Sequence, residues 1–578
     1  MSRQFTTNGV PGLFAESGGA LRAGLVFRVG QIDEPLARRG ITHLIEHLVL
    51  HRTGLTEHHY NGITAPDFTA FVTQGSADDV RTFLSGVCAS LRELPIDRLP
   101  VEKEVLRTEA ASRERGANAA MPIWRHGARG YGLTAYPEFG LAGLTAADLT
   151  AWTARYFVRG NAALWVSGPH LPDGLTVDLP DGERQALPPA PSVLPVTPAY
   201  FPGPPGVVVW DAVVPWENAA VVFAHLLSRE LHRSLRHEGG LSYTATAGHT
   251  PRADDTVLIT ALADGLPAKQ DAVLAGVVGV LDRLRRGDFE DAELAAAVKQ
   301  RCDELVDAGE QGARVMWQAV DLLLGRAASD LGDQLARTRA VSRADVTRVA
   351  QAAFAAGLLQ TPGDTEAEQA GYTAAPAASG HQVTGRAYPS LSDPAHSRAI
   401  LGAEGATVVQ GETVATVRFD ACAAALAWPD GGRRLIGADG VQVHLEPTMF
   451  HGLAAAIPVL DQHLPAACRA EMAHRDPESI PRPRLALPTI APPAGPAAPL
   501  RAPAALPDPG AKRAYLLNLV ICVAVILAFA TGTIDPAELR APSGGHPIDN
   551  LPALLFIIAL LVARSVWAIR GLLRLYRR

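Results

Sequence analysis

Two histidines and a glutamate lie within five residues of one another near the N-terminus, in the run His43-Leu44-Ile45-Glu46-His47. On a helix, residues four apart lie on the same face one turn apart, so the two imidazoles can bind a single Zn²⁺ ion. Glu46 lies on nearly the same face, where its carboxylate can take a proton from an attacking water molecule. A catalytic zinc site needs a third protein ligand and leaves its fourth position open. The motif therefore predicts a hydrolytic zinc site whose third ligand comes from elsewhere in the chain.

The residues around this motif resemble the beginning of the insulinase/pitrilysin family of zinc metallopeptidases. The run 23–35 (AGLVFRVGQIDEP) ends in an acid-proline turn and leads through Gly40 to the histidine motif. The order His-x-x-Glu-His is typical of the inverzincins. The segment Asn61-Gly62-Ile63-Thr64, followed by Phe68-Thr-Ala-Phe71, is similar to the family's edge strand. The resemblance implies that Asn61, Gly62 and Ile63 bind an extended substrate by β-addition.

A downstream segment, Glu102-Lys-Glu-Val-Leu-Arg-Thr-Glu109, resembles the family helix whose two acids are seven positions apart. The resemblance implies that Glu109 is the third zinc ligand. Glu102, two turns before it on the same face, would orient a ligand histidine. Glu104 and Glu114 are the alternatives for the third ligand. The interval from His47 to Glu109 is shorter than is common in the family, which affects the expected substrate pocket more than the ligand.

The second half of the chain contains another match, Leu235-Arg236-His-Glu-Gly-Gly-Leu-Ser-Tyr243. This run resembles an Arg…Tyr element that approaches the zinc site in relatives. The resemblance implies that Tyr243 donates a hydrogen bond to the developing oxyanion and that Arg236 binds the substrate backbone. The alternative is that Tyr243 is a core residue of a strand.

These motifs predict an endopeptidase with one Zn²⁺ per chain and a peptide substrate. The enzyme could be a general peptidase or a maturase that removes a leader peptide, and the sequence does not distinguish the two. The non-enzymatic alternative is a catalytically inactive, membrane-tethered binding or scaffold subunit. Relatives enclose a chamber with four homologous domains, and this chain offers two. The resemblance therefore implies a homodimer or a related partner subunit. In size the chain is nearest to bacterial proteins similar to the mitochondrial processing peptidase.

The elements that must position these residues indicate an α+β fold with two homologous α/β-sandwich domains. Residues 1–190 form the expected catalytic domain, with a strand at 21–29 and a helix at 41–51. A proline-rich connector at 187–206 precedes the second domain, 205–375. Thr145 with Asp148, and Ser342 with Asp345, each predict a helix start in which an N-cap hydroxyl is followed three residues later by an acid. Their similar placement in each half indicates a duplicated domain.

Bulk properties exclude some functions. The net charge of −7 leaves no basic stripe to neutralise phosphates, so we expect no nucleic-acid binding. The five cysteines are scattered, which favours buried free thiols over a disulfide framework or a cysteine-rich zinc site. The first residues lack the apolar stretch of a signal peptide, so we expect the peptidase domains to face the cytoplasm.

The C-terminal part has a different character. A linker-like stretch at 361–395 precedes a small β-rich module at 398–470 of unknown role, and a proline-rich linker follows at 471–511. Two apolar runs, 514–533 and 551–569, are each long enough to cross a bilayer. Basic residues flank the pair, and mainly acidic residues lie between them. The positive-inside rule then predicts a two-helix transmembrane hairpin at 512–578, which places the protein in the cell membrane with both ends in the cytoplasm.

Overall fold

The computed structural model describes residues 2–51, 59–112, 116–310, 312–327 and 329–483. The expected transmembrane hairpin and the proline-rich linker from residue 484 onwards lie outside these residues. Within the described ranges, no helix is both long enough and apolar enough to cross a membrane.

The first half contains a six-stranded sheet in the order β1-β2-β6-β3-β5-β4. Its strands are β1 (Ser2–Thr7), β2 (Val10–Glu16), β3 (Arg22–Phe27), β4 (His59–Thr64), β5 (Thr69–Gln74) and β6 (Ala162–Gly168). The pair β2 and β6 is parallel, and the other neighbours are antiparallel. The order places β4 at the edge of the sheet, which leaves its outer backbone groups available to another strand.

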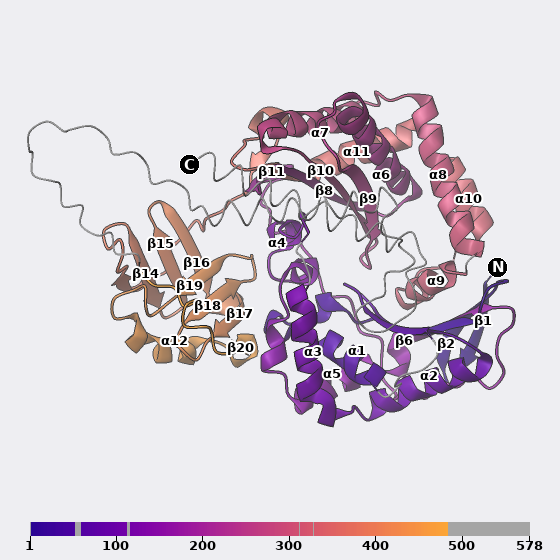
Figure 1. Cartoon of the computed structure of the whole chain (residues 1–578), viewed down its shortest axis with the longest axis horizontal. Helices are drawn as coiled ribbons and strands as arrows, with labels where there is room; N and C mark the ends of the chain where they lie inside the picture. Colours follow the sequence, from indigo (N-terminus) through magenta and orange to yellow (C-terminus); the bar gives the residue numbers. More distant parts are fainter. Residues whose placement is uncertain (1, 52–58, 113–115, 311, 328, 484–578) are drawn as a thin grey trace, which may run out of the picture. The chain divides into compact units, whose positions relative to one another are not determined.

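Helices cover one face of this sheet (Figure 1). They are α1 (Ile41–His51), α2 (Ala77–Arg92), α3 (Leu99–Ser112) and α5 (Ala146–Tyr156), and the short α4 (Met121–His126) follows α3. The apolar core between the sheet and these helices includes Phe27, Leu44, Phe71 and Phe157, all fully buried. The helix expected at 41–51 is confirmed as α1, so the histidine motif lies on one continuous helix.

The second half has a sheet of order β12-β7-β11-β8-β10-β9, in which the five strands other than β12 repeat the connectivity of β2 to β6. Its strands are β7 (Ala199–Gly203), β8 (Val207–Pro215), β9 (Ala245–Pro251), β10 (Thr256–Asp264), β11 (Leu358–Pro362) and β12 (Thr373–Ala374). The pair β7 and β11 is parallel, as β2 and β6 are. The edge strand β12 also pairs with β7 in parallel, whereas β1 pairs with β2 antiparallel. The expectation that 187–206 is only a connector is wrong at β7, because Ala199 and Phe201 are buried apolar residues that pack in the core.

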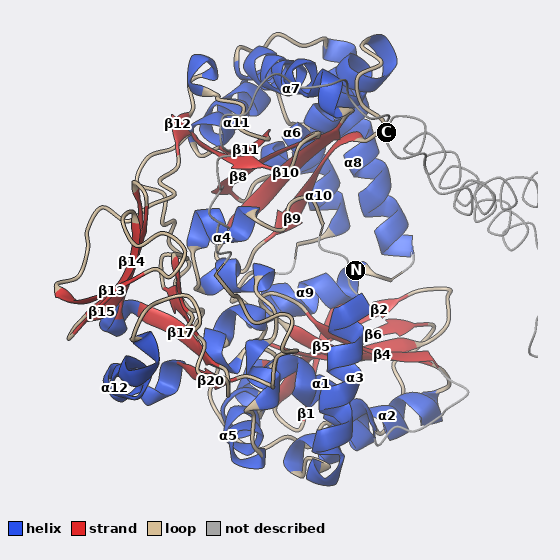
Figure 2. Ribbon diagram, turned by 60° about the vertical axis from the view of Figure 1, so that its left-hand side comes forward, coloured by secondary structure: helices blue, strands red, loops and turns tan. Residues whose placement is uncertain are grey.

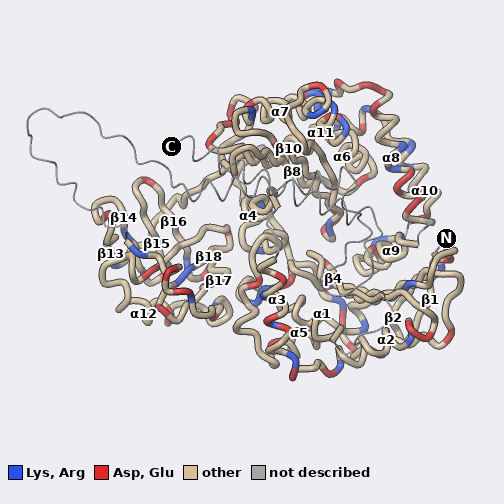
Figure 3. The backbone as a smooth tube through the Cα atoms, viewed as in Figure 1, with Lys and Arg blue, Asp and Glu red and all other residues tan. Residues whose placement is uncertain are grey.

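Helices gather on one side of the second sheet as well (Figure 2). They include α6 (Asn218–Leu231), α7 (Gln270–Arg285), α8 (Asp291–Glu310), α10 (Leu331–Arg339) and α11 (Arg343–Ala355). Basic and acidic residues alternate along α8 and α10 (Figure 3). The predicted capping residues begin α5 and α11, where Thr145 and Ser342 each accept a hydrogen bond from the backbone of the acid three residues later. These helices directly precede β6 and β11, so they occupy the same stage of the two halves.

The two halves are joined by buried contacts. Helix α9 (Arg314–Leu323) belongs to the second half but packs its apolar residues against Leu13, Val26 and Trp165 of the first sheet. Arg125 of α4 donates from Nε to the Asp211 carboxylate of β8 at 3.0 Å, and both side chains are about 5% exposed. Charge pairing and apolar packing thus act at the same interface.

A third group of strands follows the second half. The sheet β13-β14-β15-β16 and the sheet β19-β18-β17-β20 share one apolar core with helix α12 (Ile457–His463). The strands are β13 (Gly385–Pro389), β14 (Ser397–Gly402), β15 (Gly405–Gln410), β16 (Thr413–Arg418), β17 (Cys422–Ala427), β18 (Arg433–Gly437), β19 (Gln442–Leu445) and β20 (Arg469–Glu471). The expectation of a loose linker at 361–395 is wrong at β13, because Tyr388 is buried in this core. A second apolar cluster joins β17 and β20 to Leu36 and Tyr136 of the first half.

Candidate metal centre

The acid-proline turn before α1 holds the start of the metal-motif helix. Glu34 accepts hydrogen bonds from the backbone N–H groups of Gly40 at 3.0 Å and Thr42 at 2.9 Å. These are donors at a helix N-terminus, which have no partner within the helix and favour a negative charge. Arg39 donates to the same carboxylate at 2.6 Å, and Glu34 is buried. The turn therefore fixes where α1 begins and hence the direction of its histidines.

Helices α1 and α3 bring His43, His47 and Glu109 together, and we call these three residues the metal centre. One carboxylate oxygen, Glu109 Oε2, lies 3.7 Å from the Nε2 atoms of both histidines. The three ligand atoms lie within 4.8 Å of one another. Ligands at the usual Zn–N and Zn–O distances of a tetrahedral ion are about 3.3 Å apart. Two imidazoles and one carboxylate at this separation fit a Zn²⁺ ion with a fourth position open to solvent.

Each histidine of the metal centre has a carboxylate behind its other ring nitrogen. His43 Nδ1 donates to Glu138 Oε1 at 2.9 Å, and His47 Nδ1 lies 3.5 Å from Glu102 Oε2. Such partners fix the tautomer and the ring orientation of a ligand histidine, so that Nε2 is presented to the metal. Glu102 thus lies where the sequence places it. The sequence did not reveal Glu138, which comes from the loop before the turn 139–142 and belongs to no motif or helical pattern.

Negative charge surrounds His43. Burial disfavours its charged form, but the hydrogen bond and charge of Glu138, together with the charges of Glu46 and Glu109, outweigh burial and raise the pKa of His43. The same field of carboxylates attracts a divalent cation, because the attraction grows with the charge of the ion.

The side chain of Glu46 extends from α1 towards the edge strand β4, and the residue is only 7% exposed. The hydroxyl of Thr64 donates to Glu46 Oε2 at 2.6 Å. Gly62 lies against the same carboxylate, and a Cβ at that position would collide with it. The segment 61–63 therefore borders Glu46 at the open edge of the sheet. A peptide paired with β4 would pass directly beside this carboxylate.

Arg236 and Tyr243 lie near each other in the second half. The π-helical turn His232–Glu238 carries Arg236, whose guanidinium lies 4.8 Å from the centre of the Tyr243 ring. Tyr243 is 77% exposed, so the alternative of a core tyrosine is wrong. Its backbone N–H donates to Asp264 at 2.9 Å, which holds the segment before β9. In the described part of the chain, no hydrogen bond, ion pair or ring contact joins this pair to the metal centre.

The other candidates lie around the centre without joining it. His51 Nδ1 lies 3.9 Å from Glu102, and its side chain is 41% exposed. Glu104 pairs with Arg107 on the surface of α3, and Glu114 is outside the described residues. His59 is the exposed first residue of β4, where it pairs with Gln74.

Comparison with known proteins agrees with this geometry at the level of the fold. The model of the family described as "Peptidase M16 inactive domain" matches residues 199–301. A protease from Helicobacter pylori is 18% identical with a TM-score of 0.53, covering 63% of this chain and 99% of its own. The chain has an M16 peptidase-like fold.

Two further structures with this fold have other descriptions. The M16 inactive domain from Pseudomonas fluorescens is 16% identical with a TM-score of 0.53, covering 63% of this chain and 98% of its own. A chain of complex III2 from Candida albicans is 17% identical with a TM-score of 0.53, covering 62% of this chain and 95% of its own. No curated protein sequence matches this chain. The M16-like fold is thus shared with proteins called proteases and with proteins that are not, and the residues of the site must decide between them.

Proposed function

We propose that this protein is a zinc-dependent endopeptidase whose active site is the metal centre with Glu46. The observation that carries the proposal is the convergence of two Nε2 atoms on one oxygen of Glu109, at 3.7 Å each. A site that had lost its metal would not need this convergence, nor the carboxylates behind both histidines. The arrangement also keeps a buried carboxylate, Glu46, next to the ligands.

In this proposal each residue has one task. Zinc, when bound, would polarise the scissile carbonyl and lower the pKa of a water molecule. His43, His47 and Glu109 would hold the ion, while Glu138 and Glu102 orient the two imidazoles. Glu46 would take the proton of the attacking water and pass it to the leaving amine. Thr64 would keep the Glu46 carboxylate in position for both transfers.

The edge strand β4 supports a peptide as the substrate. Its inner side pairs with β5 in register from His59–Gln74 to Thr64–Thr69, and its other side has no neighbour in the sheet order. An extended peptide could add to this edge through backbone hydrogen bonds. Asn61, Gly62 and Ile63 would then position the scissile bond beside Glu46.

The decisive test compares the full chain with Glu46→Gln and Glu109→Gln, measuring bound zinc and cleavage of fluorogenic peptides. We expect the wild type to bind one Zn²⁺ and to cleave. Glu46→Gln should keep the metal and lose cleavage, whereas Glu109→Gln should lose both. Absence of zinc from the wild type, or cleavage by Glu46→Gln at the wild-type rate, would refute the proposal.

A homodimer would complete the site. The support is the separation noted above: among the described residues, no hydrogen bond, ion pair or ring contact joins Arg236 or Tyr243 to the metal centre. Mixing Glu46→Gln with Tyr243→Phe tests this directly, because a mixed dimer has one intact site only if Tyr243 acts across the interface. Recovery of activity in the mixture supports action in trans. Two inactive variants that stay inactive together would contradict it.

A second candidate function is a catalytically inactive, membrane-tethered subunit that binds peptides or a partner. The description of the matching family model as an inactive domain favours it. That match lies in the second half, whereas the metal centre lies in the first. Zinc-free wild-type protein that still binds unfolded peptides would support this function over hydrolysis.

We further propose that the chain is anchored by the hairpin at 512–578, with its peptidase domains in the cytoplasm. The support is the two uncharged or nearly uncharged apolar runs and their basic flanks. The full chain should sediment with membranes and resist extraction by carbonate, and a chain ending at residue 483 should not. Equal partitioning of the two chains would contradict the anchor.

A further inference from the structure

A cavity of about 550 Å³ lies in the second half, between the π-helical turn, the start of β9 and helix α8. We call it the basic pocket. Its lining residues are Ser228, Arg229, His232, Arg233, Arg236, His237, Tyr243, Thr244, Ala245, Thr246, Glu293 and Gln300. The lining contains three arginines and two histidines but only one acid. Helices α8 and α10, by contrast, carry residues of both signs along their length (Figure 3).

Two of the three arginines are neutralised by neighbours. Arg229 donates to Glu293 at 2.9 Å, and Arg233 donates to the buried Glu230 at 2.6 Å. Arg236 differs, since its recorded contact is with the face of the Tyr243 ring and it has no carboxylate partner among the described residues. An arginine stacked on an aromatic ring keeps its N–H groups at the edge of the guanidinium free to bind an anion.

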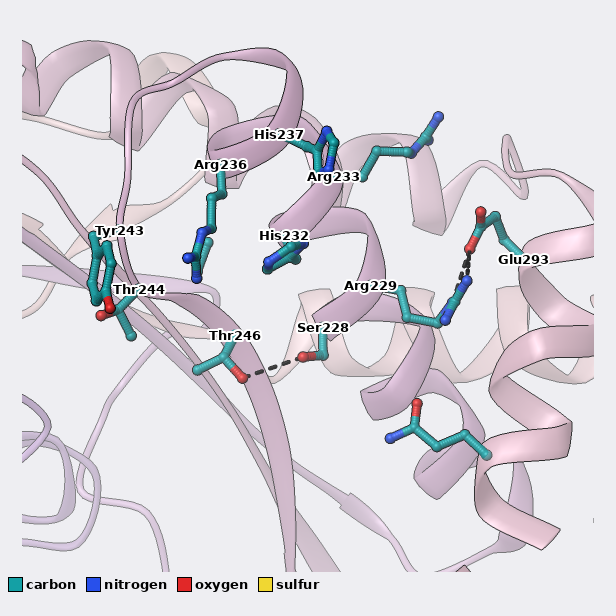
Figure 4. A pocket seen from close by; sticks show the side chains of 12 residues that line it. Ser228, Arg229, His232, Arg233, Arg236, His237, Tyr243, Thr244, Thr246 and Glu293 are labelled. Carbon is teal, nitrogen blue, oxygen red and sulfur yellow. Dashed lines mark hydrogen bonds and ion pairs between the residues drawn. The ribbon is translucent and has the colours of Figure 1, made fainter. Parts of the chain in front are cut away.

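The groups without an acidic partner converge. Figure 4 shows Arg236 and His232 reaching into the space between the π-helical turn and β9, while the Arg229–Glu293 pair lies to one side. The rings of His232 and His237 lie 6.3 Å apart, and neither has an acidic partner in the described chain. The hydroxyls of Ser228 and Thr246, 3.2 Å apart, add polar groups to the wall. The pocket therefore offers an uncompensated positive charge with hydrogen-bond donors around it.

We infer that the basic pocket binds the carboxylates of acidic side chains and makes the enzyme selective for acidic peptides. The inference rests on the proposed function, because Arg236 and Tyr243 line the pocket and are also the residues proposed to contact the substrate. An Asp or Glu side chain of a peptide that contacts Arg236 would also meet His232, which lines the same pocket. A bidentate contact with Arg236 suits the two oxygens of a carboxylate.

The experiment measures binding rather than cleavage. The full chain in detergent carries Glu46→Gln, so a peptide stays intact, and fluorescence anisotropy reports its affinity. The probes are a labelled decapeptide with three glutamates and the same peptide with glutamines instead. We expect the acidic peptide to bind about tenfold more tightly at physiological salt and to lose this advantage as salt screens the charges.

Introducing a negative charge into the pocket locates the effect. His232→Glu should remove the preference for the acidic peptide and leave the affinity for the glutamine peptide within about twofold, because only the Coulomb attraction changes. His237→Glu should act in the same direction. The matched control is Arg337→Glu, an exposed arginine of α10 outside the pocket, which should leave the preference intact. Equal affinity for the two peptides, or an equal effect of the control, would overturn the inference.

A competition experiment distinguishes two possible ligands of the basic pocket, the carboxylates of a peptide and a free anion. Inorganic phosphate should displace the acidic peptide only at concentrations at which salt alone does so. Displacement at far lower concentrations would assign the pocket to a free anion and overturn the peptide assignment. Because no step of these assays requires hydrolysis, an inactive wild type would refute the proposed function without deciding this inference. Equal binding of the two peptides by Glu46→Gln, with a wild type that cleaves fluorogenic peptides, would refute the inference alone.

Discussion

The Thr64 hydroxyl of the edge strand donates a hydrogen bond to the carboxylate of the proposed base, Glu46, at 2.6 Å. A hydrogen bond to a charged acceptor does two things here. It holds one rotamer of a side chain that otherwise has three rotatable bonds, and it leaves the second oxygen, beside Gly62, to receive a proton. The edge strand thus supplies the position of the base as well as the expected position of the peptide.

Replacement of Thr64 by valine should lower kcat by about 10- to 100-fold, since hydrogen bonds to charged groups are worth about 1.5–3 kcal/mol. KM and bound zinc should change little, because the substitution keeps the β4 backbone and the Thr64 hydroxyl bonds to Glu46 rather than to a residue of the metal centre. Steady-state kinetics with metal analysis checks both. Thr64→Ser retains the hydroxyl and should restore most of the rate. If serine is as poor as valine, the hydroxyl does not position Glu46.

Glu138 leads to a separate prediction about the metal. Glu138→Gln should weaken zinc binding by about 10- to 100-fold, because the amide is a poorer acceptor for the His43 Nδ1 proton. Competition with a chelator of known affinity measures the change. The matched control is Glu104→Gln on the surface of α3, which should bind zinc like the wild type. Unchanged affinity in Glu138→Gln would show that His43 is oriented by its packing alone.

The sequence could predict the part of this site that depends on local spacing. His43, Glu46 and His47 lie on one helix, and Glu102 and Glu109 on another, so helical periodicity and the resemblance together locate all five. Glu138 could not be found in this way, because a loop residue has no periodicity and meets His43 only through the tertiary fold. Thr64 was visible in the edge-strand motif, but its bond to Glu46 depends on how closely β4 approaches α1.

At the scale of elements, the buried Arg125–Asp211 pair joins α4 to β8. Arg125 donates twice to the Asp211 carboxylate and also to the carbonyl oxygens of Asp211 and Ala356, so four of its side-chain hydrogen bonds reach the second half. Burial of such a pair costs desolvation, but removing one partner leaves an uncompensated buried charge. The pair therefore specifies how the two halves are joined more than it adds stability.

Arg125→Ala should lower the free energy of unfolding by about 3–5 kcal/mol, because Asp211 would remain buried without its partner. Urea titration measures the loss. The control is Arg348→Ala, which breaks a more exposed pair with Glu217 and should cost less than about 1 kcal/mol. Comparable losses from the two variants would mean that the buried pair is readily hydrated.

Strand boundaries show where prediction from sequence ended. The patterns at 41–51 and 21–29 indicated a helix and a strand, and the structure has both as α1 and β3. Strands β7 and β13 were missed because each is short and lies in a segment rich in proline, glycine or small residues. Their assignment depends on partners far away in the chain, β11 for one and β14 for the other. Such pairing is a tertiary property that local composition does not reveal.

At the scale of the whole molecule, the interface between the halves contains a buried histidine that should respond to pH. Burial and the charge of Arg252, with a smaller effect of Arg125, lower the pKa of His126 to about 4. His126 Nδ1 donates to the Pro191 carbonyl at 3.1 Å, and Arg252 lies 3.3 Å from Nε2, which suits a neutral ring. The charge of Asp254 opposes the shift but does not cancel it.

In the unfolded chain His126 is protonated near pH 6.5, whereas in the folded chain it stays neutral until the pH falls to about 4. Stability from neutral His126 is therefore present above pH 6.5 and is lost as the pH falls below that value. Between pH 8 and pH 5, the wild type should lose about 2 kcal/mol more than His126→Gln. Urea titrations at the two pH values measure this difference. Equal losses of unfolding free energy in the wild type and in His126→Gln would mean that His126 is protonated in the folded chain at pH 5.

The matching connectivity of the two sheets has a consequence for how this protein can change over generations. Each half satisfies the same folding requirements with its own core, so selection for a stable fold does not oblige both to retain the same chemistry. Helix α6 occupies the place in the second half that α1 has in the first, and it carries a single histidine where α1 carries the paired motif. One half could thus conserve a reactive centre while the other half diverged into a surface that recognises charge. Neither change would destabilise the fold that the two halves share.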